Sequence, residues 1–414
     1  MNATAAVETN GRLYPFPRVP VIAICLDGCE PDYLDRAIED GLMPCLARIR
    51  ETGTDRLADA VVPTFTNPNN LSIATGVPPS VHGICGNFLF DPETGEEVMM
   101  NDVRFLRTGT IFRDLQNAGA RVGIVTAKDK LRALLGAGLT MSQDRGRCFS
   151  AERCDSTTVA EHGIENASAW LGRPRPEVYS GELSEFVFAA GVKLLREWSP
   201  DVLYLTTSDY IQHKFAPEDS EAKAFYAMFD RYLDAMDAAG AVIVLTADHG
   251  MKPKHLADGS PCVVYAQDLL DGWLGRDAAR VILPITDPYV VHHGALGSYA
   301  TAYLPSDAEV DAIIGRFLKT KGITHVLTRA EAVSRFELPA DRIGDIVIIS
   351  GSHVCIGTSR DRHDLDLLRE PLRSHGGLTE QVVPFIVNRV VDIPDEPRLR
   401  NFDAFFHATA AAAA

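Results

Sequence analysis

The chain of 414 residues is too long for one ordinary hydrophobic core, so we expect a large domain and a smaller one. Its composition is that of a globular protein, and the formal net charge of −16 argues against nucleic acid or an anionic membrane as the main partner. The polar first 20 residues contain no apolar signal segment, and no apolar run is long enough to span a bilayer. We therefore expect a cytoplasmic protein with reduced cysteines.

Four apolar runs predict the buried strands of one sheet: residues 21–26, 121–126, 202–205 and 242–245. Continuous apolar runs are typical of parallel strands that helices cover on both faces. Amphipathic stretches at 183–198 and 218–239 predict such helices. The sequence therefore predicts an α/β fold with a mostly parallel central sheet and helices on both faces. Residues before Pro20 indicate a loose arm, and 141–179 indicates loops or a partial lid.

Polar residues follow three of these strands. Asp27 comes after the first run, and Asp248-His249-Gly250 follows the run at 242–245. Ligands of open α/β sheets bind beyond the carboxyl ends of strands, so these residues are candidate metal ligands, although a polar turn is the ordinary alternative. We expect Gly250 to let the backbone turn away. Asp209 and His213 are four residues apart and would share one face of a helical turn.

An irregular stretch at 63–70 contains two prolines and three asparagines. A helix is predicted to begin near Asn69, which places Thr66 just before its start. Thr66 has an ordinary role there as an N-cap and a functional one as a nucleophile aimed by the helix N-terminus. Both roles stay open from these residues alone.

Three further residues are candidate substrate ligands. Asn87 is a neutral donor that suits an oxyanion, and Lys128 and Lys130 follow a predicted strand, where they could bind a substrate carboxylate. Paired lysines are also common on ordinary surfaces. His82 indicates a hydrogen-bonded turn residue rather than a ligand.

Beyond residue 258 the texture changes to short alternating segments, which predicts an inserted α+β cap domain over 259–371. The catalytic core is then 20–258 with 372–405. The pair His292-His293 reads as exposed or structural, and the alanine-rich end at 408–414 as frayed. Within the insertion and after it, the sequence predicts strands at 263–270, 281–283, 289–291, 345–349 and 382–387, and a helix at 308–318.

Three carboxylates, three imidazoles and a hydroxyl could share one site. Such a mixed set suits zinc, with manganese or iron as alternatives. It is too large for one tetrahedral ion, and two ions roughly 3.5–4 Å apart are an established device for displacement at phosphorus. None of the eight cysteines forms a CxxC pair, which argues against a cysteine zinc site. The set is Asp27, Thr66, Asp209, His213, Asp248, His249 and His375.

The order of these motifs resembles the alkaline phosphatase superfamily and, within it, the nucleotide pyrophosphatase/phosphodiesterase branch. The resemblance runs from about residue 20 to 388. It implies that Asp209, His213 and His375 hold one zinc ion, and that Asp27, Asp248 and His249 hold the other. Thr66 would be nucleophile and ligand, and Asn87 would bind a phosphoryl oxygen. The motifs are Asp27, Pro63-x-x-Thr66-x-Pro68-Asn69, Asp209-x-x-x-His213, Asp248-His249-Gly250 and His375-Gly376.

A narrower resemblance, to phosphonoacetate hydrolases, is carried by residues 126–131 (TAKDKL) and 66–70 (TNPNN). It implies that Thr66 attacks the phosphorus of a small anionic phosphonate, and that acetate leaves after protonation. A zinc-bound hydroxide would then hydrolyse phospho-Thr66. Lys128 and Lys130 would bind the carboxylate and stabilise charge on the leaving carbon.

Other functions stay open beside this one. The main alternative is a phosphodiesterase or nucleotide pyrophosphatase with the same metals, although Asn67 stands where that branch commonly has a phenylalanine that frames a base pocket. Thr66 argues against a phosphosugar mutase, which uses serine, and an intact ligand set with a nucleophile argues against a binding protein without catalysis. A homodimer is compatible with the sequence.

Overall fold

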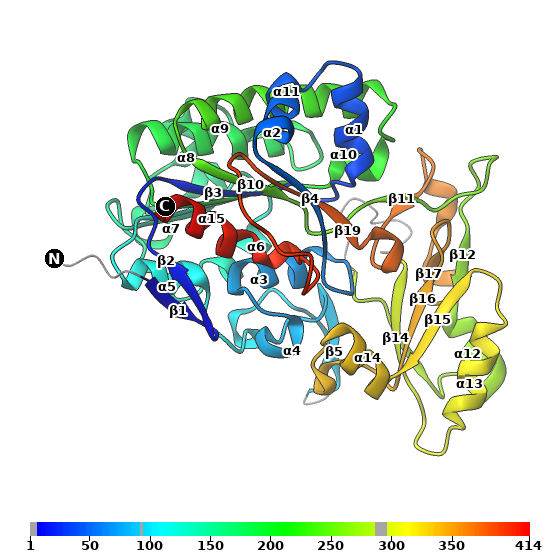
Figure 1. Cartoon of the computed structure of the whole chain (residues 1–414). Helices are drawn as coiled ribbons and strands as arrows, with labels where there is room; N and C mark the ends of the chain where they lie inside the picture. The colour runs from blue at the N-terminus through cyan, green and yellow to red at the C-terminus, as the bar shows by residue number, and fades with distance from the viewer. Residues whose placement is uncertain (1–5, 92–93, 286–295) are drawn as a thin grey trace.

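The computed structural model describes residues 6–91, 94–285 and 296–414. A seven-stranded sheet forms its centre, in the order β4-β19-β10-β3-β9-β7-β8 (Figure 1). All neighbours run parallel except β19, which is antiparallel to both β4 and β10. This confirms the predicted mostly parallel α/β sheet. The strands are β3 (Val21–Cys25), β4 (Thr54–Asp59), β7 (Val122–Thr126), β8 (Gly146–Ser150), β9 (Val202–Thr206), β10 (Val242–Thr246) and β19 (Val382–Val387).

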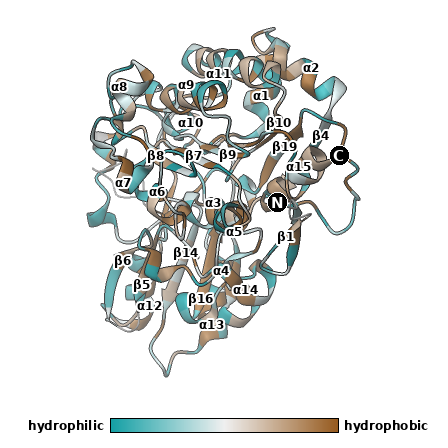
Figure 2. Cartoon of the chain, turned by 90° about the vertical axis from the view of Figure 1, so that its left-hand side faces the viewer, coloured by the Kyte–Doolittle hydropathy of each residue, from teal (hydrophilic) through white to brown (hydrophobic). Residues whose placement is uncertain are grey.

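Helices cover both faces of this sheet (Figures 1 and 2). Every residue of β3, β7, β9 and β10 is buried, which explains why these strands read as continuous apolar runs. One face carries α1 (Pro31–Glu39), α2 (Pro44–Thr52), α9 (Glu182–Glu197) and α11 (Ser220–Ala238), and the other carries α3 (Thr66–Thr75), α5 (Ile111–Asn117), α6 (Asp129–Leu135) and α15 (Ala404–Ala413).

A second, antiparallel sheet lies to one side of the first, in the order β13-β14-β16-β15. The chain enters and leaves this region side by side, because β11 (Lys252–Pro253) pairs with β18 (Arg373–Ser374). Tyr299 and Val347 of this sheet nevertheless belong to the main hydrophobic core. The division into 20–258 with 372–405 and 259–371 stays a prediction. The strands are β13 (Arg280–Ile282), β14 (Tyr299–Tyr303), β15 (Ile323–Thr328) and β16 (Ile346–Ser350), with helices α12 (Ala266–Leu274), α13 (Val310–Leu318) and α14 (Arg329–Phe336).

The strand predicted over 263–270 is wrong in its second half. Only β12 (Val263–Tyr265) is extended, and α12 begins at Ala266. Leu270 and its apolar neighbours pack the inner side of α12 against the second sheet, a helical repeat that a short apolar run conceals. The predictions for 289–291 and for His292-His293 lie outside the described residues.

The described residues near both ends of the chain, from Ala6 onward and up to Ala413, form regular structure, so the predictions of a loose arm over these residues and of a frayed terminus are wrong. A hairpin of β1 (Ala6–Thr9) and β2 (Arg12–Pro15) packs beside α15. Tyr14 is fully buried and meets the ring of Phe406 edge-on, and Arg12 forms an ion pair with Asp403 at 2.8 Å. These contacts join segments almost 400 residues apart in the sequence. The local sequence of either segment therefore does not indicate the other segment against which it packs.

The prediction of loops over 141–179 is wrong for β8, which forms one edge of the main sheet beside β7. An edge strand has a partner on one side only, and its short sequence with Arg147 part-exposed gives no continuous apolar run. The short helices α7 (Val159–His162) and α8 (Ala167–Leu171) follow it. Within the described part of the chain, no helix is both long and apolar enough to cross a membrane.

Candidate metal centre

Two groups of three side chains each bring their oxygen and nitrogen atoms within 4.8 Å of one another. The sheet explains why they meet. Asp27, Asp209 and Asp248 follow β3, β9 and β10, which are neighbours in the sheet, and so lie at the same edge. The first group is Asp209, His213 and His375, and the second is Asp27, Asp248 and His249. The structure thus brings together the six carboxylate and imidazole residues that the sequence predicted as ligands.

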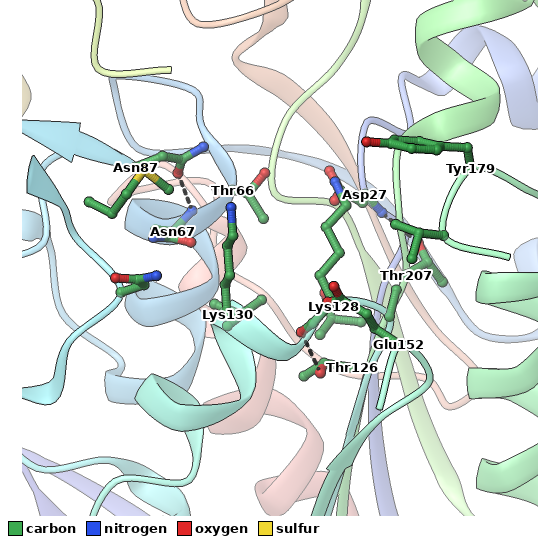
Figure 3. A pocket seen from close by; sticks show the side chains of 16 residues that line it. Asp27, Thr66, Asn67, Asn87, Thr126, Lys128, Lys130, Glu152, Tyr179 and Thr207 are labelled. Carbon is green, nitrogen blue, oxygen red and sulfur yellow. Dashed lines mark hydrogen bonds between the residues drawn. The ribbon is translucent and has the colours of Figure 1, made fainter. Parts of the chain in front are cut away.

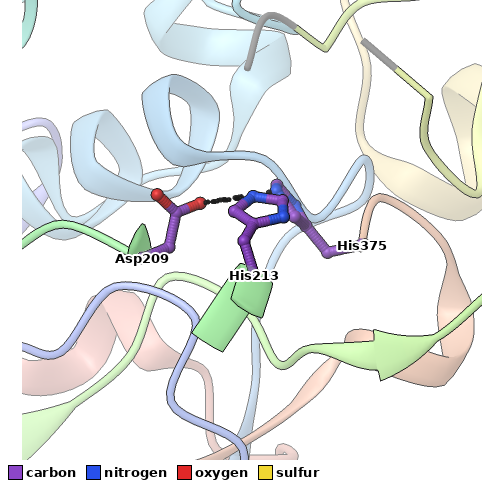
Figure 4. A group of neighbouring side chains, drawn as sticks. All are labelled: Asp209, His213 and His375. Atoms are coloured by element: carbon purple, nitrogen blue, oxygen red, sulfur yellow. Dashed lines mark ion pairs between the residues drawn. The ribbon is translucent and has the colours of Figure 1, made fainter. Parts of the chain in front are cut away.

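The first group surrounds the start of the short helix α10 (Tyr210–Lys214), with Asp209 immediately before it (Figure 4). Asp209 Oδ2 lies 3.0 Å from His213 Nε2 and 3.7 Å from His375 Nε2. The spacing of four residues therefore does place Asp209 and His213 together. His375 reaches them from the turn after β18, at the far end of the sequence.

The second group is fully buried. His249 Nε2 lies 3.3 Å from Asp27 Oδ1 and 3.7 Å from Asp248 Oδ2. The backbone N–H of Gly28 donates to Asp248 Oδ1 at 3.2 Å, and Asn70 Nδ2 donates to Oδ2 at 3.1 Å. The two groups adjoin, because the rings of His249 and His375 stack with their centroids 3.6 Å apart.

All three imidazoles are oriented by the same kind of contact, between Nδ1 and a backbone carbonyl oxygen. Nδ1 lies close to a backbone carbonyl oxygen in each: 3.0 Å to Arg373 for His213, 2.9 Å to Gly250 for His249, and 2.8 Å to Thr64 for His375. A carbonyl only accepts, so Nδ1 carries a proton in each ring, and Nε2 is the nitrogen left to face a metal ion. This arrangement is typical of histidines that bind metal through Nε2.

The charge of the second group calls for a cation. Among the described residues, the carboxylate oxygens of Asp27 and Nε2 of His249 are buried without a hydrogen-bond partner. Burial, together with the charges of Asp209 and Asp248, raises the pKa of Asp27 well above its usual value. Burial and Asp209 raise the pKa of Asp248 to about 7. A bound divalent cation would compensate these charges, so the residues present fit a metal.

Asp209 behaves differently from these two carboxylates. Its burial alone would raise its pKa, but Lys128 and His213 outweigh that effect and hold the pKa well below its usual value. Lys128 Nζ lies 3.3 Å from Asp209 Oδ1, so the lysine contacts the first ligand group directly. The lysine predicted for substrate is therefore also next to the metal centre.

Thr66 is the first residue of α3, so the predicted start near Asn69 is three residues late. Phe65 is the N-cap, and the ordinary reading of Thr66 as the cap is wrong. Asn69 bonds the backbone of Val61 through both ends of its amide, which ties the preceding loop to the first helical turn. The N–H of Asn67 donates to Asn87 Oδ1 at 2.9 Å, so the Asn87 amide is fixed beside Thr66.

A pocket of about 270 Å³ opens beside Thr66 and Asp27 (Figure 3). Asn87, Lys128 and Lys130 line it as well, so the structure gathers the predicted substrate ligands around the predicted nucleophile. Sequence reasoning missed several other lining residues. Among them are Met99, Asn101, Glu152, Val178 and Tyr179, which come from segments without a periodic pattern.

Comparison with known proteins agrees with this geometry. The sequence model of the type I phosphodiesterase / nucleotide pyrophosphatase family matches residues 21–378. The chain belongs to this family. Its sequence is also 68% identical to that of phosphonoacetate hydrolase from Sinorhizobium meliloti 1021, whose crystal structure was solved in complex with phosphonoacetate. The two structures superpose with a TM-score of 0.96 over 98% of this chain and 99% of that one. A second complex of the same hydrolase, with phosphonoformate, is 69% identical with the same TM-score and coverage.

More distant members share the fold or a part of the sequence. Murine ectonucleotide pyrophosphatase / phosphodiesterase 5 has a TM-score of 0.62 at 18% identity, over 95% of each chain. Ectonucleotide pyrophosphatase/phosphodiesterase family member 1 from Mus musculus is 35% identical over 251 residues, which are 57% of this chain and 24% of that protein. The chain spans about a quarter or less of the curated relatives it matches. The family consists of metal-dependent hydrolases of the alkaline phosphatase superfamily.

Two smaller predictions around the site have different outcomes. His82 is hydrogen-bonded, as predicted, but it is the last residue of the short helix α4 (Pro79–His82) rather than a turn residue. It contacts Ser72 Oγ and the N–H of Ile84, and burial lowers its pKa to about 3. Gly250 does not adopt the left-handed conformation, whereas Gly28, with φ 71°, and Gly376, with φ 122°, do so directly after the predicted ligands Asp27 and His375. That Gly250 lets the backbone turn away after His249 stays a prediction.

Proposed function

We propose that this protein hydrolyses the carbon–phosphorus bond of phosphonoacetate to acetate and phosphate, through a phospho-Thr66 intermediate. The observation that carries the proposal is the 68% identity, over 98% of the chain, with a phosphonoacetate hydrolase solved with phosphonoacetate. The pocket supports it independently, because a nucleophile, an amide donor and two lysines line one cavity of a size that suits a small anion.

The proposed enzyme uses two divalent ions, zinc first, with manganese or iron as alternatives. Asp209, His213 and His375 would hold one ion, and the buried group of Asp27, Asp248 and His249 would hold the other, with Thr66 beside it. Bound ions of this kind activate a hydroxyl group and neutralise phosphoryl oxygens.

The first chemical step joins Thr66 to phosphorus. Thr66 Oγ loses its proton and attacks, so an O–P bond forms while the C–P bond breaks, and the electron pair of that bond stays with carbon. The amide nitrogen of Asn87 would donate to a phosphoryl oxygen, since Asn87 Oδ1 already accepts from the N–H of Asn67. Carbon then takes up a proton, and acetate leaves.

The two lysines would make carbon a better leaving group. Because the carbon is next to a carboxylate, its charge delocalises into an enolate-like form, and the ammonium groups of Lys128 and Lys130 would stabilise that charge. Lys128 is positioned for this by its contact with Asp209, and Lys130 lines the same pocket. In the second half of the reaction, water hydrolyses phospho-Thr66, which releases phosphate and returns the hydroxyl.

The deciding experiment measures both products from phosphonoacetate. Zinc-loaded protein should release phosphate and acetate in equal amounts, and EDTA-stripped protein should release neither until zinc is restored. The phosphate should pass through Thr66, so brief acid quenching should trap a phosphorylated protein. Metal-dependent turnover that releases no acetate would contradict the proposal.

A phosphodiesterase or nucleotide pyrophosphatase activity at the same site is the second candidate, because the family match favours it. The polar Asn67, whose amide donates to the carbonyl of Met100 at 2.9 Å, argues against stacking of a nucleotide base at this position. The ratio of kcat/KM for phosphonoacetate to that for bis-p-nitrophenyl phosphate separates the two. A ratio below one would favour the diesterase.

Two further parts of the proposal concern the whole molecule. A cytoplasmic location and a homodimer stay predictions. Light scattering on purified protein would measure the mass in solution, and a value of twice 45.1 kDa would support the dimer.

A further inference from the structure

Glu152 is a carboxylate in the wall of a pocket proposed to bind an anionic substrate (Figure 3). Its negative charge repels an anionic substrate, so a direct contact with the substrate does not explain its position in the pocket. It comes from the turn after β8, which is the edge strand that sequence analysis did not predict. The N–H of Glu152 continues the pairing of this segment by donating to the carbonyl of Ala127 at 3.0 Å.

The side chain of Glu152 bonds the start of α6. Glu152 Oε2 accepts the backbone N–H of Asp129 at 2.8 Å, and Asp129 is the first residue of that helix. The N-cap residue of α6 is Lys128, whose side chain makes no capping hydrogen bond. Glu152 therefore provides from a distant segment the acceptor that an N-cap residue usually provides itself.

The peptide group between Lys128 and Asp129 is held on both sides. Its N–H donates to Glu152, and its carbonyl oxygen accepts the hydroxyl of Thr126 at 2.9 Å. A peptide group is planar, so two hydrogen bonds on opposite sides fix its orientation. That orientation sets the direction of the Lys128 side chain and the angle at which α6 presents Lys130.

Asp129 adds a second connection to the same segment. Ser150 Oγ, at the end of β8, donates to Asp129 Oδ1 at 2.9 Å, and Arg132 Nε contacts the same oxygen at 2.8 Å. The end of β8 thus contacts both the backbone and the side chain of the first residue of α6.

We propose that Glu152 is a positioning residue for the two pocket lysines, and that it acts through the backbone N–H of Asp129 rather than on substrate. The inference rests on the proposed function, because it concerns the lysines assigned to the substrate carboxylate. It goes beyond that function because it names a residue that determines substrate selectivity although it does not contact the substrate.

The test measures phosphonoacetate binding by calorimetry in zinc-loaded Thr66→Ala protein, where turnover does not interfere. Glu152→Ala should weaken binding about fivefold, the scale expected for loss of a helix cap. Glu152→Gln keeps an acceptor oxygen and removes the opposing charge, so it should bind as well as the parent or better. Glu161→Gln is the matched control, because Glu161 contacts Arg132 of the same helix but is outside the pocket lining.

A double-mutant cycle decides whether the effect passes through a lysine. In a Lys128→Ala background, Glu152→Ala should change binding less than twofold. An equal effect in both backgrounds, or Glu152→Gln binding as weakly as Glu152→Ala, would overturn the inference. Binding unchanged in Glu152→Ala would overturn it too.

Kinetics with Thr66 restored separate this inference from the proposed function. Glu152→Ala should raise KM for phosphonoacetate and lower kcat/KM for bis-p-nitrophenyl phosphate far less, because the diester has no carboxylate. An equal loss on both substrates would place the effect at the metal centre and overturn the inference. If the parent enzyme released no acetate, the proposed function would fail, while the binding experiment would still decide the role of Glu152.

Discussion

The two sides of the pocket are built in different ways. On the metal side, the predicted ligands are almost entirely buried. The three aspartates among them follow three adjacent strands, and every imidazole is oriented by a backbone carbonyl. On the lysine side, Lys128 and Lys130 begin a helix of seven residues, and Lys130 is exposed. A sheet holds the first side, whereas a few hydrogen bonds to one turn hold the second.

This difference separates two requirements of the proposed chemistry. Metal ions need ligands at fixed positions, which neighbouring strands provide. Substrate choice needs a few groups that can change without disturbing those ligands, and a short helix start beside an edge strand provides them. We therefore expect substitutions on the metal side to reduce every activity, and substitutions on the lysine side to change the preference between substrates.

Thr66→Ala should have the largest effect, because the nucleophile serves every substrate of this site. We expect kcat to fall by at least about 10³-fold on both phosphonoacetate and bis-p-nitrophenyl phosphate. Thr66→Ser is the control and should keep measurable turnover. Unchanged turnover of either substrate by Thr66→Ala protein would contradict the proposal that Thr66 is the nucleophile for both substrates.

Lys128→Ala should sharpen the comparison by acting on one substrate. We expect kcat/KM for phosphonoacetate to fall about 10²-fold, the scale of losing one donor to a developing negative charge. The diester should be affected far less. Lys128 also contacts Asp209, so zinc content should be measured in parallel. Loss of zinc together with both activities would assign the lysine to the metal side.

Asn70→Ala tests the support of the metal side. Asn70 donates to Asp248 Oδ2 at 3.1 Å and accepts from the Tyr204 hydroxyl at 2.7 Å, so it orients a predicted ligand without lining the pocket. We expect zinc affinity to fall by roughly 10- to 100-fold, measured by competition with a chelator. Activity on both substrates should recover at saturating zinc. A change in substrate preference instead would contradict the expectation that the metal side affects both activities equally.

A change of pH should have the smallest effect, and its sign differs between metal binding and stability. The pKa of Asp248 is raised to about 7, so zinc must displace a proton below that pH. Zinc affinity should fall about fivefold from pH 7 to pH 6 for one proton displaced from a group with this pKa. In metal-free protein the contribution of Asp248 to stability should instead rise on the same change, because stability due to a raised carboxyl pKa is lost as pH rises through it. Buried histidines with a lowered pKa, such as His82, act in the opposite direction, so the contribution of Asp248 is measured as the difference between the parent and Asp248→Asn.

Calorimetry at pH 6 and pH 8 gives both quantities, through zinc titration and thermal unfolding of EDTA-stripped protein. A difference in stability between metal-free parent and Asp248→Asn that did not rise from pH 8 to pH 6 would contradict the raised pKa of Asp248.

The sequence by itself determined the inner parallel strands β3, β7, β9 and β10 of the central sheet and indicated the predicted ligand set. Buried parallel strands require continuous apolar runs, and the charged residues that follow them are conspicuous because no charged residue lies within the run. Asp27, Asp209 and Asp248 were predictable for that reason, and His213 from its helical spacing to Asp209. His375 has no strand before it of that kind, and its motif order rather than its local pattern indicated it.

Only the tertiary structure decided which distant segments support this site and complete the fold. Glu152 was not predictable, because β8 lacks an apolar run and its pairing with β7 is a long-range contact. The same reason explains the two ends of the chain, where Tyr14 and α15 bury each other across the whole sequence. The periodicity of apolar residues indicates which face of a helix or strand is buried. A contact between two short or atypical segments produces no such periodicity in either sequence.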